Sequence, residues 1–183
     1  EDSSIEAATR SGALSLEKER VARTPYAAIA AESPEHALTE AQKRAVESIC
    51  ASDKTVQLLH GVTGSGKTEI YLTLIAKTLK EGKSAIFLVP EIALTPQMFK
   101  QLRARFGESA AILHSGLSAG EKFDEWWRLR TGEAKIAIGA RSAVFAPVEN
   151  VGVIVMDEEH DQSYVSESSP RYRTDEIARL RAE

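Results

Sequence analysis

The glycine-rich stretch at residues 61–68, with the sequence GVTGSGKT, has residue types and spacing suited to binding phosphate. It matches the pattern G-x-x-x-x-G-K-[ST] at every defined position. Glycines let the backbone fold closely around an anion, so that successive N–H groups point inward. Lys67 is expected to reach the β- and γ-phosphates of a nucleotide, and the Thr68 hydroxyl to ligate Mg²⁺. The nucleotide contacts predicted from this loop are Gly61, Thr63, Gly64, Ser65, Gly66, Lys67 and Thr68.

Acidic residues follow an apolar run near the other end of the chain, where residues 151–156 read VGVIVM and residues 157–160 read DEEH. Parallel-sheet proteins bind ligands at the carboxyl ends of buried strands. Asp157 can hold the Mg²⁺ that Thr68 also contacts, and Glu158 can polarise a water for attack on the γ-phosphate. Alone, the quartet is typical of a solvated acidic loop. With the phosphate loop it predicts a nucleotide-hydrolysing site, whose catalytic residues are Lys67, Asp157 and Glu158.

Strands and helices must position these two motifs. Residues 56–59 (VQLL) are predicted to form a buried strand before the phosphate loop, and residues 69–75 (EIYLTLI) a helix after it. Other apolar runs predict strands over residues 84–89, 110–113, 135–139 and 151–156. Apolar strands that alternate with helices indicate a mostly parallel sheet with helices on both faces, so the predicted fold class is α/β.

Capping residues predict where the helices begin. N-caps are expected at four positions, namely Thr39, Thr95, Ser118 and Thr174. The first and third have Gln42 and Glu121 three residues later, which is the spacing of a capping box. The helix after Thr95 begins with a proline and should end at Gly107. On the helix after Ser118, Trp126 and Trp127 are expected to cover the core rather than to stack on bases.

Composition limits the class of protein. The chain has 183 residues, 43% hydrophobic and 27% charged, with a net charge of −4, which is ordinary for a soluble globular domain. The negative charge argues against a generally basic nucleic-acid-binding surface. The single cysteine, Cys50, excludes an internal disulfide and fits a reducing, cytoplasmic location. There is no signal-peptide pattern and no apolar run near the ~20 residues of a membrane span, so no membrane partner is expected.

Two segments differ in character. Residues 1–36 alternate apolar and charged positions over 14–23, consistent with a strand, and have linker composition over 27–34. Residue 1 is Glu rather than Met, which suggests a processed or shortened chain. We therefore expect an N-terminal segment or linker over residues 1–36 and the nucleotide-binding domain over residues 37–183.

Five stretches resemble a known family. They are residues 61–69, 89–97 (VPEIALTPQ), 113–117 (LHSGL), 138–147 (IGARSAVFAP) and 157–164 (DEEHDQSY). Asp-Glu-x-His after an apolar strand resembles motif II of superfamily 2 helicases. The whole set resembles the PriA family of replication-restart helicases from about residue 38 to residue 181.

The resemblance implies a RecA-like, ATP-binding domain that is the first of two such motor domains in the family. It also implies that residues 1–36 are the tail of a winged-helix DNA-binding domain. The second domain's arginine finger and the family's zinc-binding cysteines have no counterpart in this sequence. Zinc is therefore expected only in the remainder of a full-length protein, and this stretch alone is expected to be nearly inactive.

The resemblance also implies DNA contacts from three loops. The residues concerned are Glu91, Thr95, Gln97, Arg141, Ser142, Tyr164, Arg171 and Tyr172. Tyr164 and Tyr172 with nearby arginines can form a stacking platform for single strands, although both tyrosines could instead pack against the sheet. Related helicases use a glutamine before the nucleotide strand to bond adenine. Gln42 has that place, but its position in a capping box gives it a structural role as well.

The predicted function is the motor domain of an ATP- and Mg²⁺-dependent 3′-to-5′ DNA helicase in replication restart and primosome assembly. Its predicted partners are forked or single-stranded DNA and, by resemblance, replication-restart and single-strand-binding proteins. One alternative is a double-stranded DNA translocase of superfamily 2, which would share both nucleotide motifs. Another is a nucleotide-regulated binding module for replication proteins that barely hydrolyses ATP.

Overall fold

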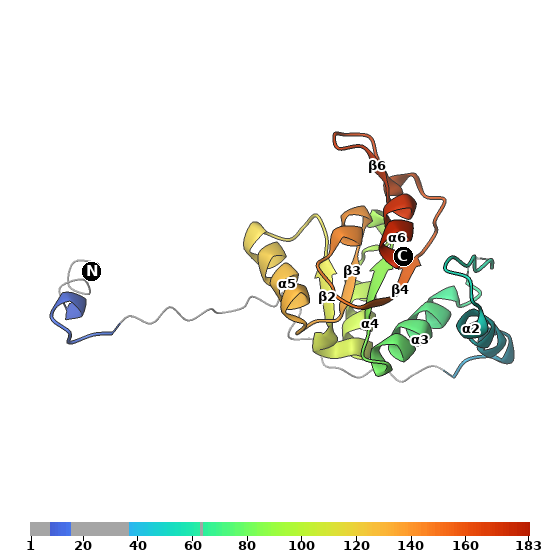
Figure 1. The fold of residues 1–183 in the computed structure, drawn as a ribbon, viewed down its shortest axis with the longest axis horizontal. Helices are drawn as coiled ribbons and strands as arrows, with labels where there is room; N and C mark the ends of the chain where they lie inside the picture. The colour runs from blue at the N-terminus through green and yellow to red at the C-terminus, as the bar shows by residue number, and fades with distance from the viewer. Residues whose placement is uncertain (1–7, 16–36, 63) are drawn as a thin grey trace.

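The computed structural model describes residues 8–15, 37–62 and 64–183, and a parallel sheet of four strands lies at its centre (Figure 1). The strands are β1 (Ser84–Leu88), β2 (Ala110–Leu113), β3 (Ile136–Gly139) and β4 (Val151–Met156). Their order across the sheet is β2-β3-β1-β4, and every pair is parallel. Ile86 of β1, for example, pairs with Ala137 on one side and Ile154 on the other. The predicted α/β class with a parallel sheet is confirmed.

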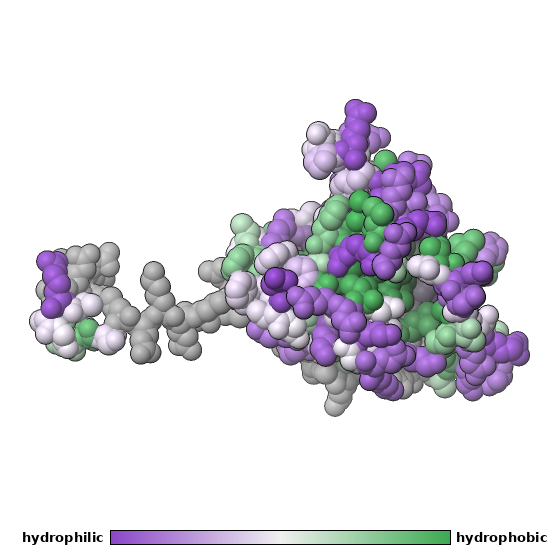
Figure 2. All heavy atoms as spheres, in the orientation of Figure 1, coloured by the Kyte–Doolittle hydropathy of each residue, from purple (hydrophilic) through white to green (hydrophobic). Residues whose placement is uncertain are grey.

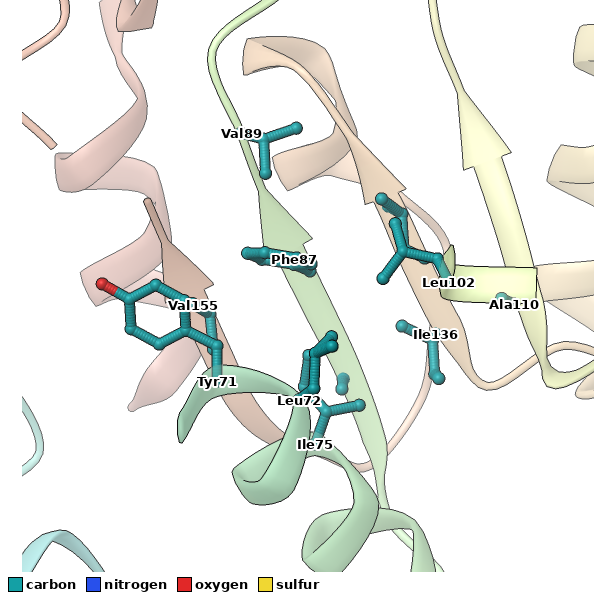
Figure 3. Packing of buried hydrophobic residues seen from close by; sticks show 11 residues of the cluster. Tyr71, Leu72, Ile75, Phe87, Val89, Leu102, Ala110, Ile136 and Val155 are labelled. Atoms are coloured by element: carbon teal, nitrogen blue, oxygen red, sulfur yellow. The ribbon is translucent and has the colours of Figure 1, made fainter. Parts of the chain in front are cut away.

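Helices cover both faces of this sheet. The helices on one face are α3 (Lys67–Lys80) and α4 (Pro96–Phe106), and their side chains join the cluster around Phe87 (Figure 3). The other face is covered by α5 (Ala119–Thr131), the 3₁₀ turn η3 (Arg141–Phe145) and α6 (Thr174–Ala182). A further helix, α2 (Glu40–Ala51), packs against α3 through Val46, Ile70 and Leu74. Because β1 and β3 are buried on both faces, their continuous apolar sequence is what this architecture requires.

The predicted helix starts are confirmed at three of the four N-caps. Thr39 and Ser118 each form a complete capping box. The Thr95 hydroxyl accepts a hydrogen bond from the Met98 N–H, and α4 ends at Gly107. Thr174 differs, because it lies inside α6 with Arg173 as the N-cap, and its hydroxyl donates to the Tyr164 carbonyl at 2.8 Å.

The predicted strand at residues 56–59 is wrong. These residues form no regular element, and Val56 and Leu58 are 50% and 77% exposed. A strand is stable only beside a neighbour, and within the described ranges nothing pairs with the outer edge of β4. Hydrophobic atoms are visible on the surface of this region, beside α2 (Figure 2).

The expectation that two tryptophans cover the core is also wrong. Trp126 and Trp127 are 43% and 39% exposed. The buried face of α5 instead presents Glu125, Arg128 and Leu129 to the sheet. Apolar periodicity failed here because a paired charge network occupies the inward face.

Short elements complete the described structure. They are the 3₁₀ turns η1 (Glu91–Ala93), η2 (Gly107–Ser109) and η4 (Gln162–Tyr164), and an antiparallel hairpin of β5 (Val165–Ser166) and β6 (Tyr172–Arg173). The strand expected over residues 14–23 and the linker over 27–34 lie, apart from residues 14 and 15, outside the described residues. Among the helices that the structure describes, none has the length and apolar character needed to cross a membrane.

Candidate nucleotide-binding site

The phosphate loop turns directly into α3, and glycine is required at its last position. Gly66 is the N-cap of α3 and has φ = 80°, a left-handed conformation that side chains with Cβ rarely adopt. A Cβ built there would lie 2.3 Å from the Gln42 side-chain nitrogen. The first N–H groups of α3 therefore open toward the loop, as binding of an anion by a helix N-terminus requires.

Lys67 connects the loop to the acidic motif. Its Nζ donates to the Gly61 carbonyl at 2.9 Å and lies 3.6 Å from a carboxylate oxygen of Glu158. The Lys67 side chain is only 16% exposed, whereas that of Glu158 is 43% exposed. A nearly buried ammonium thus faces a carboxylate from the opposite motif across the loop.

A tight turn at the end of β4 positions the acidic residues. The Asp157 N–H donates to the Leu88 carbonyl, which extends the β4–β1 ladder by one residue. The Glu158 N–H donates to the Asp157 Oδ1 at 3.1 Å, and Glu158 has φ = 47°. A left-handed conformation is costly for a residue with a Cβ and is found preferentially at functional sites.

The two motifs form one pocket. The residues that line it are Gly64, Gly66, Lys67, Thr68, Asp157 and Glu158. Residues about ninety positions apart in the sequence are therefore brought together, and the pocket contains all three residues predicted to be catalytic. Thr63, also predicted to contact the nucleotide, lies outside the described residues.

Asp157 has an environment suited to a metal ligand. Burial raises the pKa of its carboxyl, and the nearby Glu158 raises it further, against the lowering effects of the Glu158 N–H, Lys67 and Tyr71. A half-buried carboxylate next to a second carboxylate is stabilised by a cation. Thr68 offers a hydroxyl in the same pocket, and oxygen donors are the ligands that Mg²⁺ prefers. The donor set fits Mg²⁺, with Thr68 and Asp157 as the residues that would hold it.

Tyr71 lies next to the acidic turn, and the sequence analysis did not select it. It is 8% exposed, and its hydroxyl points away from the apolar cluster that surrounds the ring (Figure 3). Burial raises the pKa of Tyr71 to about 12, with further contributions from Asp157 and Glu158. Its position four residues after Lys67, on the same face of α3, is a signal that could have identified it.

Gln42 has the structural role that its capping position indicated. Its Oε1 accepts from the Thr39 N–H at 2.9 Å. Its Nε2 lies 3.3 Å from the Ser65 carbonyl and 3.4 Å from the Gly66 carbonyl, and donates to both. Gln42 thus connects the start of α2 to the phosphate loop, while its contact with adenine stays a prediction.

The loops predicted to contact DNA lie at the carboxyl end of the sheet, where the pocket also lies. Glu91, Thr95 and Gln97 are exposed and follow the carboxyl end of β1. Arg141 and Ser142 begin η3, directly after β3. Because parallel strands end on one side of the sheet, these loops and the acidic turn share that side. The DNA contacts themselves stay predictions.

Tyr164 does not lie where a stacking residue should. It is 3% exposed, packs in the cluster on the α5–α6 face and donates from its hydroxyl to the Asp157 carbonyl at 2.8 Å. The expectation of an exposed Tyr164 ring is corrected by this burial, and the alternative of packing against the sheet holds for it. Tyr172 is half-buried and Arg171 is exposed, so both remain accessible.

Fold and site together define a nucleotide-binding domain of the P-loop class with RecA-like architecture. A family model described as DEAD/DEAH box helicase matches residues 39–179. The chain belongs to the DEAD/DEAH box helicase family, and membership implies nucleotide binding together with a metal ion.

Relatives within that family have one name in common. The chain is 50% identical over 184 residues to the replication restart protein PriA of Bacillus subtilis, covering 98% of this chain and 23% of that protein. It is 45% identical over 185 residues to PriA of Synechocystis, covering 99% and 22% respectively. For PriA of Haemophilus influenzae the identity is 49% over 123 residues, covering 67% and 17%. The resemblance to PriA is confirmed, and the chain spans about a sixth to a quarter of the length of these relatives.

Proposed function

We propose that residues 37–183 are an ATP-binding motor domain that, in the full-length gene product, drives 3′-to-5′ unwinding of branched DNA in replication restart. The observation that supports this most directly is the approach of Lys67 to Glu158 at 3.6 Å, across a pocket shared by both motifs. A phosphate-binding lysine and an acidic turn are the two parts that nucleotide hydrolysis needs from one domain.

In the proposed reaction each residue has a separate role. Lys67 moves its ammonium from the Gly61 carbonyl to the β- and γ-phosphates and neutralises the charge that develops there. Glu158 holds the attacking water and accepts its proton. Asp157 and Thr68 would hold Mg²⁺, which when bound offsets phosphate charge. Tyr71 faces Asp157 and restrains its carboxylate.

The similarity to PriA proteins, whose name refers to replication restart, supports a role in that process, and the proposed direction, substrate and partners are those that the sequence resemblance implies. We propose forked or single-stranded DNA as the substrate, and primosome and single-strand-binding proteins as partners. A double-stranded DNA translocase would have the same nucleotide site. The two functions differ in one result, because only a helicase separates the strands.

Lys67→Ala in the full-length gene product tests the nucleotide site. Loss of one preorganised charge in the transition state should lower ATP hydrolysis by about a hundredfold or more, measured as phosphate release. Lys77→Ala is the matched control, because Lys77 lies on the same helix but outside the pocket. Hydrolysis at the wild-type rate by Lys67→Ala would refute the assignment.

Duplexes with a single-stranded 3′ tail, a 5′ tail or a fork then test direction and substrate. We expect strand displacement on the fork and on the 3′-tailed duplex, and little on the 5′-tailed duplex. ATP hydrolysis stimulated by blunt duplex without strand displacement would instead favour the translocase.

A further inference from the structure

An aromatic pair lies between η3 and the β5–β6 hairpin, and one of its members, Phe145, has no role in the predicted site. The ring centroids of Phe145, the last residue of η3, and Tyr172, the first of β6, are 5.1 Å apart with planes at 74°. This is the edge-to-face geometry in which aromatic rings attract. Phe145 is nevertheless 53% exposed, so much of its ring is open to solvent.

Arg141 fixes the pair in place. Its guanidinium lies 5.8 Å from the centre of the Tyr172 ring, and its Nη1 donates to the Val165 carbonyl at 2.6 Å. The same arginine therefore binds one strand of the hairpin through its backbone and the other through a ring. Because both Arg141 and Phe145 lie against the half-buried Tyr172, Phe145 is the ring with the larger accessible surface.

We propose that Phe145 is a stacking site for an unpaired DNA base, with Tyr172 and Arg141 as the residues that position its ring. This inference rests on the proposed function only in taking DNA as the ligand. It gives to Phe145 the role that the sequence predicted for Tyr164, which is buried. Base–aromatic stacking needs one rigid, exposed ring beside positive charge.

Several features favour a base over an apolar protein surface. The exposed ring lies after β3, on the side of the sheet where the acidic turn and the loop after β1 lie. Arg171, next to Tyr172 in the sequence, is exposed, and its Nε donates to the Glu167 carbonyl at 3.1 Å. Its charge has no carboxylate partner among the described residues and can meet a phosphate, whereas Arg173 is paired with Asp175 at 3.1 Å. The hairpin projects from the body, and its outer end is hydrophilic (Figures 1 and 2). One small exposed aromatic pair with arginine at its side suits a nucleotide better than a broad apolar partner.

The test measures binding of the full-length gene product to single-stranded oligonucleotides with 2-aminopurine at successive positions. Phe145→Leu keeps an apolar side chain but removes the π face. It should weaken binding roughly fivefold or more and abolish quenching of 2-aminopurine at the stacked position. ATP hydrolysis without DNA should not change.

Phe123→Leu is the matched control. Phe123 is 55% exposed and forms an aromatic pair with Trp127 at 6.0 Å, but it lies on α5. This variant should bind the oligonucleotides as the wild type does. An equal loss in both variants would show that any exposed aromatic ring has this effect, and would overturn the inference.

An abasic site distinguishes stacking from a structural role. The wild type should lose affinity when the stacked base is removed, whereas Phe145→Leu should lose nothing further. If Phe145→Leu lowers the melting temperature, Phe145→Tyr and Phe145→Trp decide, because both keep a stacking face and should retain quenching. Wild-type affinity and quenching in Phe145→Leu would overturn the inference, and so would failure of the wild type to bind these oligonucleotides. Either result leaves the Lys67 test of the nucleotide site unaffected.

Discussion

The two edge strands of the sheet, β2 and β4, differ in what their outer sides bond. At the β2 edge, side chains from neighbouring helices bond the strand's own backbone: Glu125 accepts from the Ile112 N–H at 2.9 Å, and Arg103 donates to the Ala110 carbonyl at 3.2 Å. At the β4 edge, no strand among the described residues pairs with the outer side, and the strand ends in the acidic turn. The backbone of the β2 edge is bonded by buried charged side chains, whereas the β4 edge has no strand partner within the described ranges and lies beside the pocket.

The difference shows what charged residues do in each place. Glu125 and Arg128 are 3% and 5% exposed in their side chains and are joined at 2.8 Å, so they satisfy each other. Lys67 and Glu158 are 3.6 Å apart, and the Glu158 side chain is 43% exposed. A fully paired and buried charge network is destabilised strongly when one partner is removed, whereas loosely paired charges around a cavity can still bind a ligand.

Breaking the β2 edge should have the largest effect on stability. Glu125→Ala leaves the Ile112 N–H without its acceptor, and among the described residues it leaves Arg128 with the exposed Glu108 as its charged partner. Removing one member of a buried ion pair costs about 3–5 kcal/mol, and we expect the lower end of that range. Urea unfolding with and without nucleotide would measure the loss and show that nucleotide affinity is unchanged.

An exposed ion pair between the same helix and the loop before β4 provides the control. Arg130 and Glu149 are 3.1 Å apart with side chains 54% and 80% exposed. Arg130→Ala should therefore cost less than about 1 kcal/mol. If both variants lost the same stability, the distinction between the two edges would fail.

Local signals in the sequence predicted the parts of the fold that depend on local chemistry. Thr39 and Ser118 cap their helices through side chains three residues away, and Gly66 has the left-handed conformation that the phosphate loop requires. The strand predicted at residues 56–59 depends on a neighbour that its own sequence does not specify. The inward face of α5 depends on the charge network at the β2 edge, so the prediction that Trp126 and Trp127 cover the core was wrong.

The second prediction concerns the hydrogen bond that joins Tyr164, the last residue of η4, to the acidic turn. Tyr164→Phe removes the donor to the Asp157 carbonyl and leaves the buried ring in place. A hydrogen bond of this kind contributes about 0.5–1.5 kcal/mol, so the variant should unfold at slightly lower urea concentration. Tyr172→Phe is the control, since its hydroxyl makes no hydrogen bond within the described residues, and it should stay within about 0.5 kcal/mol of wild type. Equal stability of all three proteins would mean that this bond contributes nothing.

The site was predictable as a set of residues but not as an arrangement. Both motifs were identified from residue types and spacing, because phosphate and metal chemistry restrict which side chains can serve. The direction of the Tyr164 ring could not be predicted, since an aromatic residue after an acidic turn can face solvent or the core. In the folded chain the ring faces the core, where it is buried and its hydroxyl donates to the Asp157 carbonyl.

The smallest predicted effect is a gain in stability rather than a loss, and it concerns Asp157 itself. Burial raises the pKa of this carboxyl, so the folded state binds its proton more tightly than the unfolded chain does. Stability is therefore lost as pH rises from the unfolded value of 3.8 through the higher folded pKa. Asp157→Asn removes this loss and should be more stable than wild type at pH 7, with the gain shrinking toward pH 4.

Asp161 provides the opposite case four residues later. Hydrogen bonds from Ser163, whose N–H lies 2.8 Å from the Asp161 Oδ1, lower the pKa of that carboxyl. Its contribution to stability is present above the unfolded pKa and is lost as pH falls through the folded one, so Asp161→Asn should destabilise at pH 7. Thermal melts of both variants at pH 7 and pH 4, without divalent metal or nucleotide, would test the pair. If Asp157→Asn were less stable than the wild type at pH 7, ionised Asp157 would stabilise the β4 edge. The contrast with the β2 edge would then be lost.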